Sequence, residues 1–75
     1  MPRLPTVSAK KLIKVLKKKG FFHDRTKGSH FIYVNLKRDI SVSIPVHQGK
    51  DLGRGLTKKI LDDAEISVDE FLELL

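Results

Sequence analysis

Residues 40–44 alternate strictly between apolar and polar side chains, reading Ile-Ser-Val-Ser-Ile, and a proline follows at position 45. This period of two predicts a β-strand with one face buried and one face in water. Pro45 has no backbone N–H to donate, so we expect the strand to end there. A sheet built around this strand has one covered face and one open face, with Ser41 and Ser43 on the open one.

Two further strands are predicted before this one. Residues 21–26 form the first, and residues 30–35, which are rich in aromatic and β-branched side chains, form the second. The corner at residues 27–29 contains Gly28, which permits positive φ, and residues 36–39 make the next turn. Short sequential strands joined by tight turns pair most simply as an antiparallel meander.

A helix is predicted before the strands, after an extended lead-in over residues 1–7 that contains Pro2 and Pro5. Ser8 suits the N-cap, and Gly20 suits the left-handed residue that follows a helix. The apolar residues recur at helical spacing: Ala9, Leu12, Ile13 and Leu16, with Val15 beside them. The other face carries Lys10, Lys11, Lys14, Lys17 and Lys18.

The C-terminal part is expected to contain a loop and two helices. Residues 46–55 form a loop with three glycines. A helix follows over about residues 56–64, with Leu56, Ile60, Leu61 and Ala64 on its inner side. Ser67 and Glu70 form a capping box for a last short helix. The sequence therefore predicts one α+β domain over residues 1–75, ordered α-β-β-β-α, with a three-stranded antiparallel sheet and the helices on one face.

The net charge of +6 is unevenly distributed. Residues 1–38 hold 11 Lys and Arg against one acid, whereas residues 39–75 hold four against eight. A basic surface of this density attracts polyanions, chiefly nucleic acid. Three other interpretations stay open for the lysines of the first helix: a solvated face, a favourable interaction with the helix dipole, or a surface for an acidic protein partner.

Several classes of function are disfavoured by the sequence. It has no cysteine and no two histidines at helical or metal-motif spacing, so we expect no metal site and no cofactor. Residues 49–55 are rich in glycine but match neither a phosphate-binding loop nor a dinucleotide fingerprint. No apolar run is long enough to span a membrane, and the N-terminus lacks the apolar stretch of a signal peptide, so we expect a cytoplasmic protein.

His30 is the best candidate for chemistry. Histidine can act as general base or general acid near neutral pH without a metal. RNA supplies its own nucleophile, the 2′-hydroxyl, and nearby cations can stabilise charge on the phosphate. Lys27, Lys50 and Arg54 are the predicted phosphate contacts, and His47 is either the complementary acid, a phosphate ligand or an ordinary exposed loop residue. From these residues alone, a single histidine at a strand start is more often structural than catalytic.

A resemblance adds to this interpretation. The run Gly28-Ser29-His30-Phe31-Ile32-Tyr33, followed by Ile44-Pro45-Val46-His47, then Gly49-Lys50 and a helix opening near Gly55, resembles the HicA toxin family of bacterial toxin–antitoxin systems. Lys19-Gly20-Phe21 and the ending Ser67-Val68-Asp69-Glu70-Phe71 are similar as well. The likeness runs from about Ser8 to Phe71. The family's Gly-Thr pair at the start of the second helix is interrupted here by Leu56, which leaves any hydroxyl contact of Thr57 unassigned.

The resemblance implies a fold like that of double-stranded-RNA-binding domains and the activity of a type II toxin, an endoribonuclease that cleaves mRNA. It places the catalytic histidine at His30 and implies a HicB-like antitoxin as protein partner. RNA or phosphate contacts are then expected from Lys27, Gly28, Ser29, His47, Lys50 and Arg54.

Two other functions remain open at this point. The same fold can serve as a non-catalytic RNA-binding module in which His30 is structural or stacks on a base. Alternatively, the basic face binds an acidic protein.

Overall fold

The computed structural model describes residues 3–47 and 50–75; Pro2 of the lead-in and Gly49 of the glycine-rich loop lie outside the described residues. The elements in chain order are β1 (Val7–Ser8), α1 (Ala9–Lys18), β2 (Phe22–Lys27), β3 (His30–Asn35), β4 (Ile40–Pro45), β5 (Asp51–Leu52), α2 (Arg54–Ala64) and α3 (Val68–Leu74).

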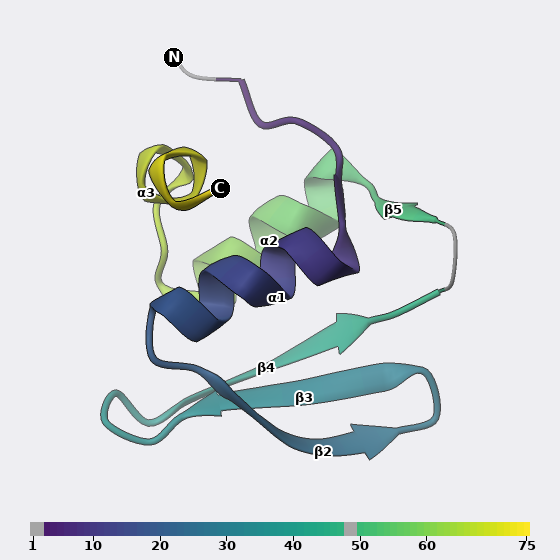
Figure 1. Cartoon of the computed structure of the whole chain (residues 1–75), viewed down its shortest axis with the longest axis vertical. Helices are drawn as coiled ribbons and strands as arrows, with labels where there is room; N and C mark the ends of the chain where they lie inside the picture. The colour runs from purple at the N-terminus through teal and green to yellow at the C-terminus, as the bar shows by residue number, and fades with distance from the viewer. Residues whose placement is uncertain (1–2, 48–49) are drawn as a thin grey trace.

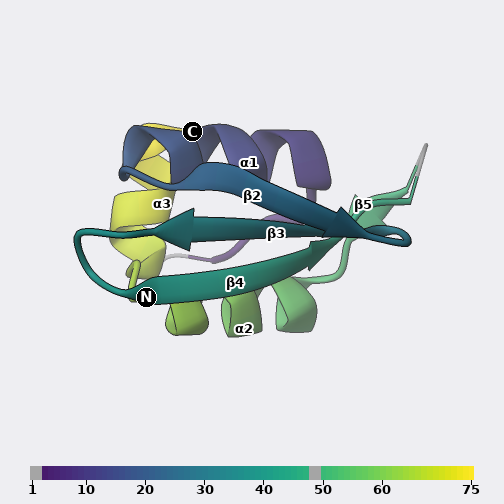
Figure 2. The same cartoon turned by 90° about the horizontal axis from the view of Figure 1, so that it is seen from below.

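Strands β2, β3 and β4 form an antiparallel sheet in that order, and the helices lie on one side of it (Figure 1). Seen from below, the strands stand in front of α1 and α2 (Figure 2). Buried apolar side chains from the helices and from the inner side of the sheet form the core between these layers. The predicted α+β architecture is confirmed, and we call the side of the sheet turned away from the helices the open face.

The residues predicted to begin and end α1 have the expected roles. The Ser8 hydroxyl accepts a hydrogen bond from the Lys11 backbone N–H at 3.2 Å, which satisfies one of the free donors in the first turn. At the other end Gly20 has φ of 93°, a conformation that side-chain-bearing residues rarely adopt. Leu12, Val15 and Leu16 are fully buried toward the core.

Helix α2 corrects two expectations. It begins at Arg54 with Gly53 as N-cap, so Gly55 lies inside the helix rather than opening it. Leu56 was expected inside but is 38 % exposed, whereas Thr57 is fully buried. The buried set Thr57, Ile60, Leu61 and Ala64 has complete helical spacing, and its first member is a threonine.

A second, smaller sheet corrects the prediction of a plain loop over residues 46–55. Strand β1 pairs antiparallel with β5, with Val7 opposite Leu52 and Ser8 opposite Asp51. Val7 and Leu52 are both buried, so this pair continues the core. It also fixes the start of α1 beside residues 51 and 52.

Candidate functional site

The open face is identified by the register of β3 and β4. Ile32 lies opposite Ser43, Val34 opposite Ser41, and these alternate with Tyr33 opposite Val42, a pair that is buried against the helices. Directly opposed residues share a face, and alternate residues of a strand share a face. Ser41 and Ser43 are exposed, as the alternating pattern predicted.

His30 belongs to this open face, two residues before Ile32 on β3. It lies opposite Pro45 on β4 and opposite Lys27 on β2, and both His30 and Lys27 are exposed. Its ring forms no hydrogen bond with another described side chain or backbone group. The imidazole is therefore available to a ligand, with a cation directly across the strand pair.

The turn between Lys27 and His30 consists of Gly28 and Ser29 alone. Gly28 has φ of 58° and nothing within 4 Å of the position where a Cβ would stand. Glycine with positive φ at the first of two turn residues is the pattern of a type II′ hairpin. A tight turn of this kind holds Lys27 and His30 in register, and it leaves space above the glycine for a ligand to approach.

Arg25 is a further cation on the open face, which the sequence reasoning missed. It lies opposite Ile32, is exposed and pairs with the adjacent Asp24. The register shifts between His23 and Arg25, so Asp24 is the extra residue of a β-bulge.

His47 and Lys50 lie in the loop after β4, beside the start of α1. The Val46 backbone N–H donates to the Ser29 carbonyl at 2.8 Å, which ties the loop after β4 to the turn before His30. His47 and Lys50 then line a pocket of about 460 Å³ together with Ser8, Ala9, Lys10, Val46 and Asp51. Arg54 is exposed at the start of α2 and does not line this pocket.

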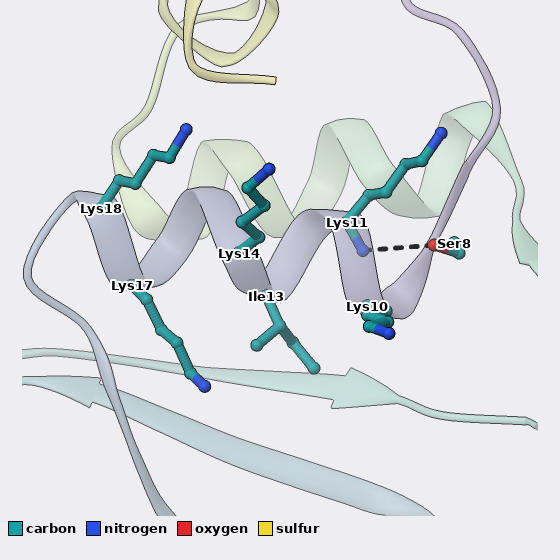
Figure 3. A pocket seen from close by; sticks show the side chains of 7 residues that line it. All are labelled: Ser8, Lys10, Lys11, Ile13, Lys14, Lys17 and Lys18. Atoms are coloured by element: carbon teal, nitrogen blue, oxygen red, sulfur yellow. Dashed lines mark hydrogen bonds between the residues drawn. The ribbon is translucent and has the colours of Figure 1, made fainter.

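Two lysines at the C-terminal end of α1, Lys18 and the C-cap Lys19, contact α3. Lys18 donates to the Leu74 carbonyl at 2.8 Å and Lys19 pairs with Glu70, so these two hold α3 against α1. Seven residues of the Ser8–α1 segment line a shallow hollow of about 750 Å³ over Ile13, including Lys10, Lys14 and Lys17 (Figure 3). Lys17 and Ile13 point toward the strands, whereas Lys14 points away from them (Figure 3). α1 covers the opposite side of the sheet from the open face, so its middle lysines and His30 belong to different surfaces.

The remaining residues weighed from the sequence have structural roles. His23 packs edge-on against Phe31 and Tyr33, with ring centroids 5.5 and 5.6 Å apart, and bonds the Thr26 hydroxyl at 2.8 Å. Tyr33 is a core residue, and burial raises the pKa of its phenol. Thr57 is fully buried, so its hydroxyl cannot reach a ligand on the surface.

Residues 3–47 and 50–75 contain no group of three or more His, Cys, Asp or Glu side chains placed to hold a metal ion. Within the same residues, no helix has the length and apolar character needed to cross a membrane.

Comparison with known families identifies the chain. The family model of the HicA toxin of bacterial toxin–antitoxin systems matches residues 9–66, from the start of α1 to the residue before the N-cap of α3. This chain belongs to the HicA toxin family. A comparison with curated proteins gave no match. The family-model match covers most of the chain and includes His30 and His47. It confirms the resemblance noted from the sequence. HicA proteins are the toxins of toxin–antitoxin pairs, so an antitoxin is the expected partner.

Proposed function

We propose that this HicA protein is a metal-independent endoribonuclease that cleaves mRNA, with His30 as the general base, and that a HicB-like antitoxin neutralises it. The observation that carries the proposal is the position of His30. It is exposed on the open face of the sheet, without an internal hydrogen bond among the described residues, and a lysine stands directly across the strand pair. Family membership supplies the toxin context.

The chemistry needs groups on this face, the RNA itself and a proton from solvent. His30 takes the proton of a 2′-hydroxyl, the 2′-oxygen attacks the adjacent phosphorus, and the bond from phosphorus to the 5′-oxygen breaks. The departing 5′-oxygen takes a proton from solvent. Lys27 and Arg25 stand on the same face to stabilise charge on the phosphate oxygens. The products are a 2′,3′-cyclic phosphate and a 5′-hydroxyl.

Family membership supports the antitoxin proposal, and the open face is where such a partner would act. An inhibitor protein that covers the open face would block the access of RNA to both His30 and Lys27. The exposed cations Arg25 and Lys27 favour a partner that presents acidic side chains there.

The test is cleavage of an end-labelled RNA in EDTA by wild type and His30→Ala, with His23→Ala as the matched histidine control. General acid–base catalysis contributes about 10²- to 10⁴-fold, so His30→Ala should cut at least about 100-fold more slowly while it binds the RNA as well as wild type. His23→Ala should cut normally, and the ends should carry cyclic phosphate.

Two results would overturn the proposal. Equal cleavage by wild type and His30→Ala would remove His30 from catalysis. Binding without cleavage by the wild type would make the protein an RNA-binding module.

A further inference from the structure

The pocket shared by the start of α1 and the loop after β4 joins segments that are far apart in the sequence. Its basic side chains are Lys10 from α1 and Lys50 from the loop, and His47 also lines it. The β1–β5 pair is what brings them together, because Ser8 stands opposite Asp51. One backbone bond, from the Lys50 N–H to the His47 carbonyl at 3.2 Å, holds the two loop residues to each other.

This pocket is adjacent to the turn of Gly28 and Ser29 that precedes His30. Ser29, the residue before His30, accepts the hydrogen bond from Val46, the residue before His47. His30 is adjacent to Ser29 and His47 is adjacent to Val46, and Ser29 and Val46 are hydrogen-bonded neighbours. The Cα atoms of His30 and His47 are therefore within roughly 13 Å of each other. An RNA strand that leaves His30 toward this end of the molecule passes the pocket.

The charge of the pocket fits an anion. Lys10, His47 and Lys50 are all exposed, so their polar atoms are open to a ligand. Asp51 is the acid in the lining and opposes anion binding. Two lysines against one aspartate leave the pocket positive, and its volume is about 460 Å³.

We infer that Lys10, His47 and Lys50 form a phosphate subsite that binds the RNA backbone beside the scissile phosphate. This inference rests on the proposed RNA substrate, and it gives Lys10 a role separate from that of the other α1 lysines. It assigns His47 to binding rather than to proton transfer.

Binding of a fully 2′-O-methylated RNA oligonucleotide, which cannot be cleaved by the proposed chemistry, tests the subsite without catalysis. Lys10→Ala and Lys50→Ala should each lower the affinity several-fold and reduce the slope of log affinity against log salt by about 0.7, the value for one lost contact to a single strand. Asp51→Asn should raise the affinity. Lys37→Ala is the matched control, because Lys37 is an exposed lysine in the β3–β4 turn at the other end of the sheet.

Kinetics on cleavable RNA separate a subsite from a structural role. Lys10→Ala should raise KM for an oligonucleotide and leave kcat unchanged, and it should not affect a dinucleotide, which is too short to reach the pocket. Its urea midpoint should equal that of wild type.

Three outcomes would overturn the inference: equal losses of affinity in Lys10→Ala and Lys37→Ala, no gain in Asp51→Asn, or unchanged RNA affinity with weaker binding to polyglutamate, which would assign the pocket to a protein. If the subsite variants behave as expected but wild type does not cleave RNA, the proposed catalysis fails and the subsite stands.

Discussion

Thr57→Val is the substitution for which the structure most clearly predicts the direction of the change in stability. Thr57 is fully buried on the inner side of α2, and its Oγ1 has no hydrogen-bond partner among the described residues. Its backbone N–H is satisfied, since it donates to the Gly53 carbonyl at 2.9 Å. Valine has nearly the same shape and replaces the unpaired hydroxyl with a methyl group.

The expected gain follows from the cost of the buried hydroxyl. Burying such a group without a partner costs about 1–3 kcal/mol in protein mutational data. Threonine and valine are both β-branched and have similar helix propensities, so the substitution changes the intrinsic stability of α2 very little. We expect Thr57→Val to raise the free energy of unfolding by about 1–3 kcal/mol, and each kcal/mol should raise Tm by about 4–8 °C in a domain of this size.

Urea denaturation followed by circular dichroism measures this change. Thr57→Ser is the control, because it keeps the hydroxyl and removes a buried methyl group, and it should be less stable than wild type. RNA cleavage should be the same in all three proteins. A Thr57→Val protein that is less stable than wild type would refute the reasoning, since it would show that the hydroxyl is satisfied, most directly by the Gly53 carbonyl.

Two further predictions concern a glycine and a carboxylate. Gly20→Ala should lower the free energy of unfolding by about 1–2 kcal/mol, because φ of 93° disfavours a side chain and the new Cβ would stand 3.3 Å from Asn35 Nδ2. Gly55→Ala, in α2 with nothing within 4 Å of the new Cβ, should raise it by about 0.5–1 kcal/mol. A loss of stability in both variants, measured by urea denaturation, would contradict this. The hydrogen bond from Lys19 lowers the pKa of Glu70 below its ordinary value of 4.5, so its stabilising contribution is present above pH 4.5 and is lost as the pH falls through the lower folded-state pKa. The Tm difference between wild type and Glu70→Gln should therefore shrink on acidification, and a difference independent of pH would contradict the assignment.

The sheet and α1 were predictable because their signals are local. Alternation over residues 40–44, glycine at the turn before His30, and the Ser8 and Gly20 caps each act within a few residues. The β1–β5 pair carries no such signal, since each strand has two residues and the partners are distant in the chain. The pocket of Lys10, His47 and Lys50 depends on that pair, so it could not be found from spacing.

The inner side of α2 was misjudged for a different reason. Reading only apolar residues as buried selected Leu56 and passed over Thr57, although Thr57 completes the spacing with Ile60, Leu61 and Ala64. The core accepts the threonine because its methyl group packs there, at the cost of an unpaired hydroxyl.

The bulge at Asp24 decides which cations accompany His30. In an uninterrupted strand, residues 22, 24 and 26 would share the open face, and Arg25 and Lys27 would point toward the helices. The extra residue reverses the alternation, so that Arg25 lies opposite Ile32 and Lys27 opposite His30 on the open face. The open-face position of His30 was therefore predictable from its turn and strand, but the placement of Arg25 and Lys27 on that face depends on an irregularity that sequence periodicity does not contain. The reversed alternation places Lys27, together with Arg25 and its ion-pair partner Asp24, around the proposed base, where a phosphate would bind.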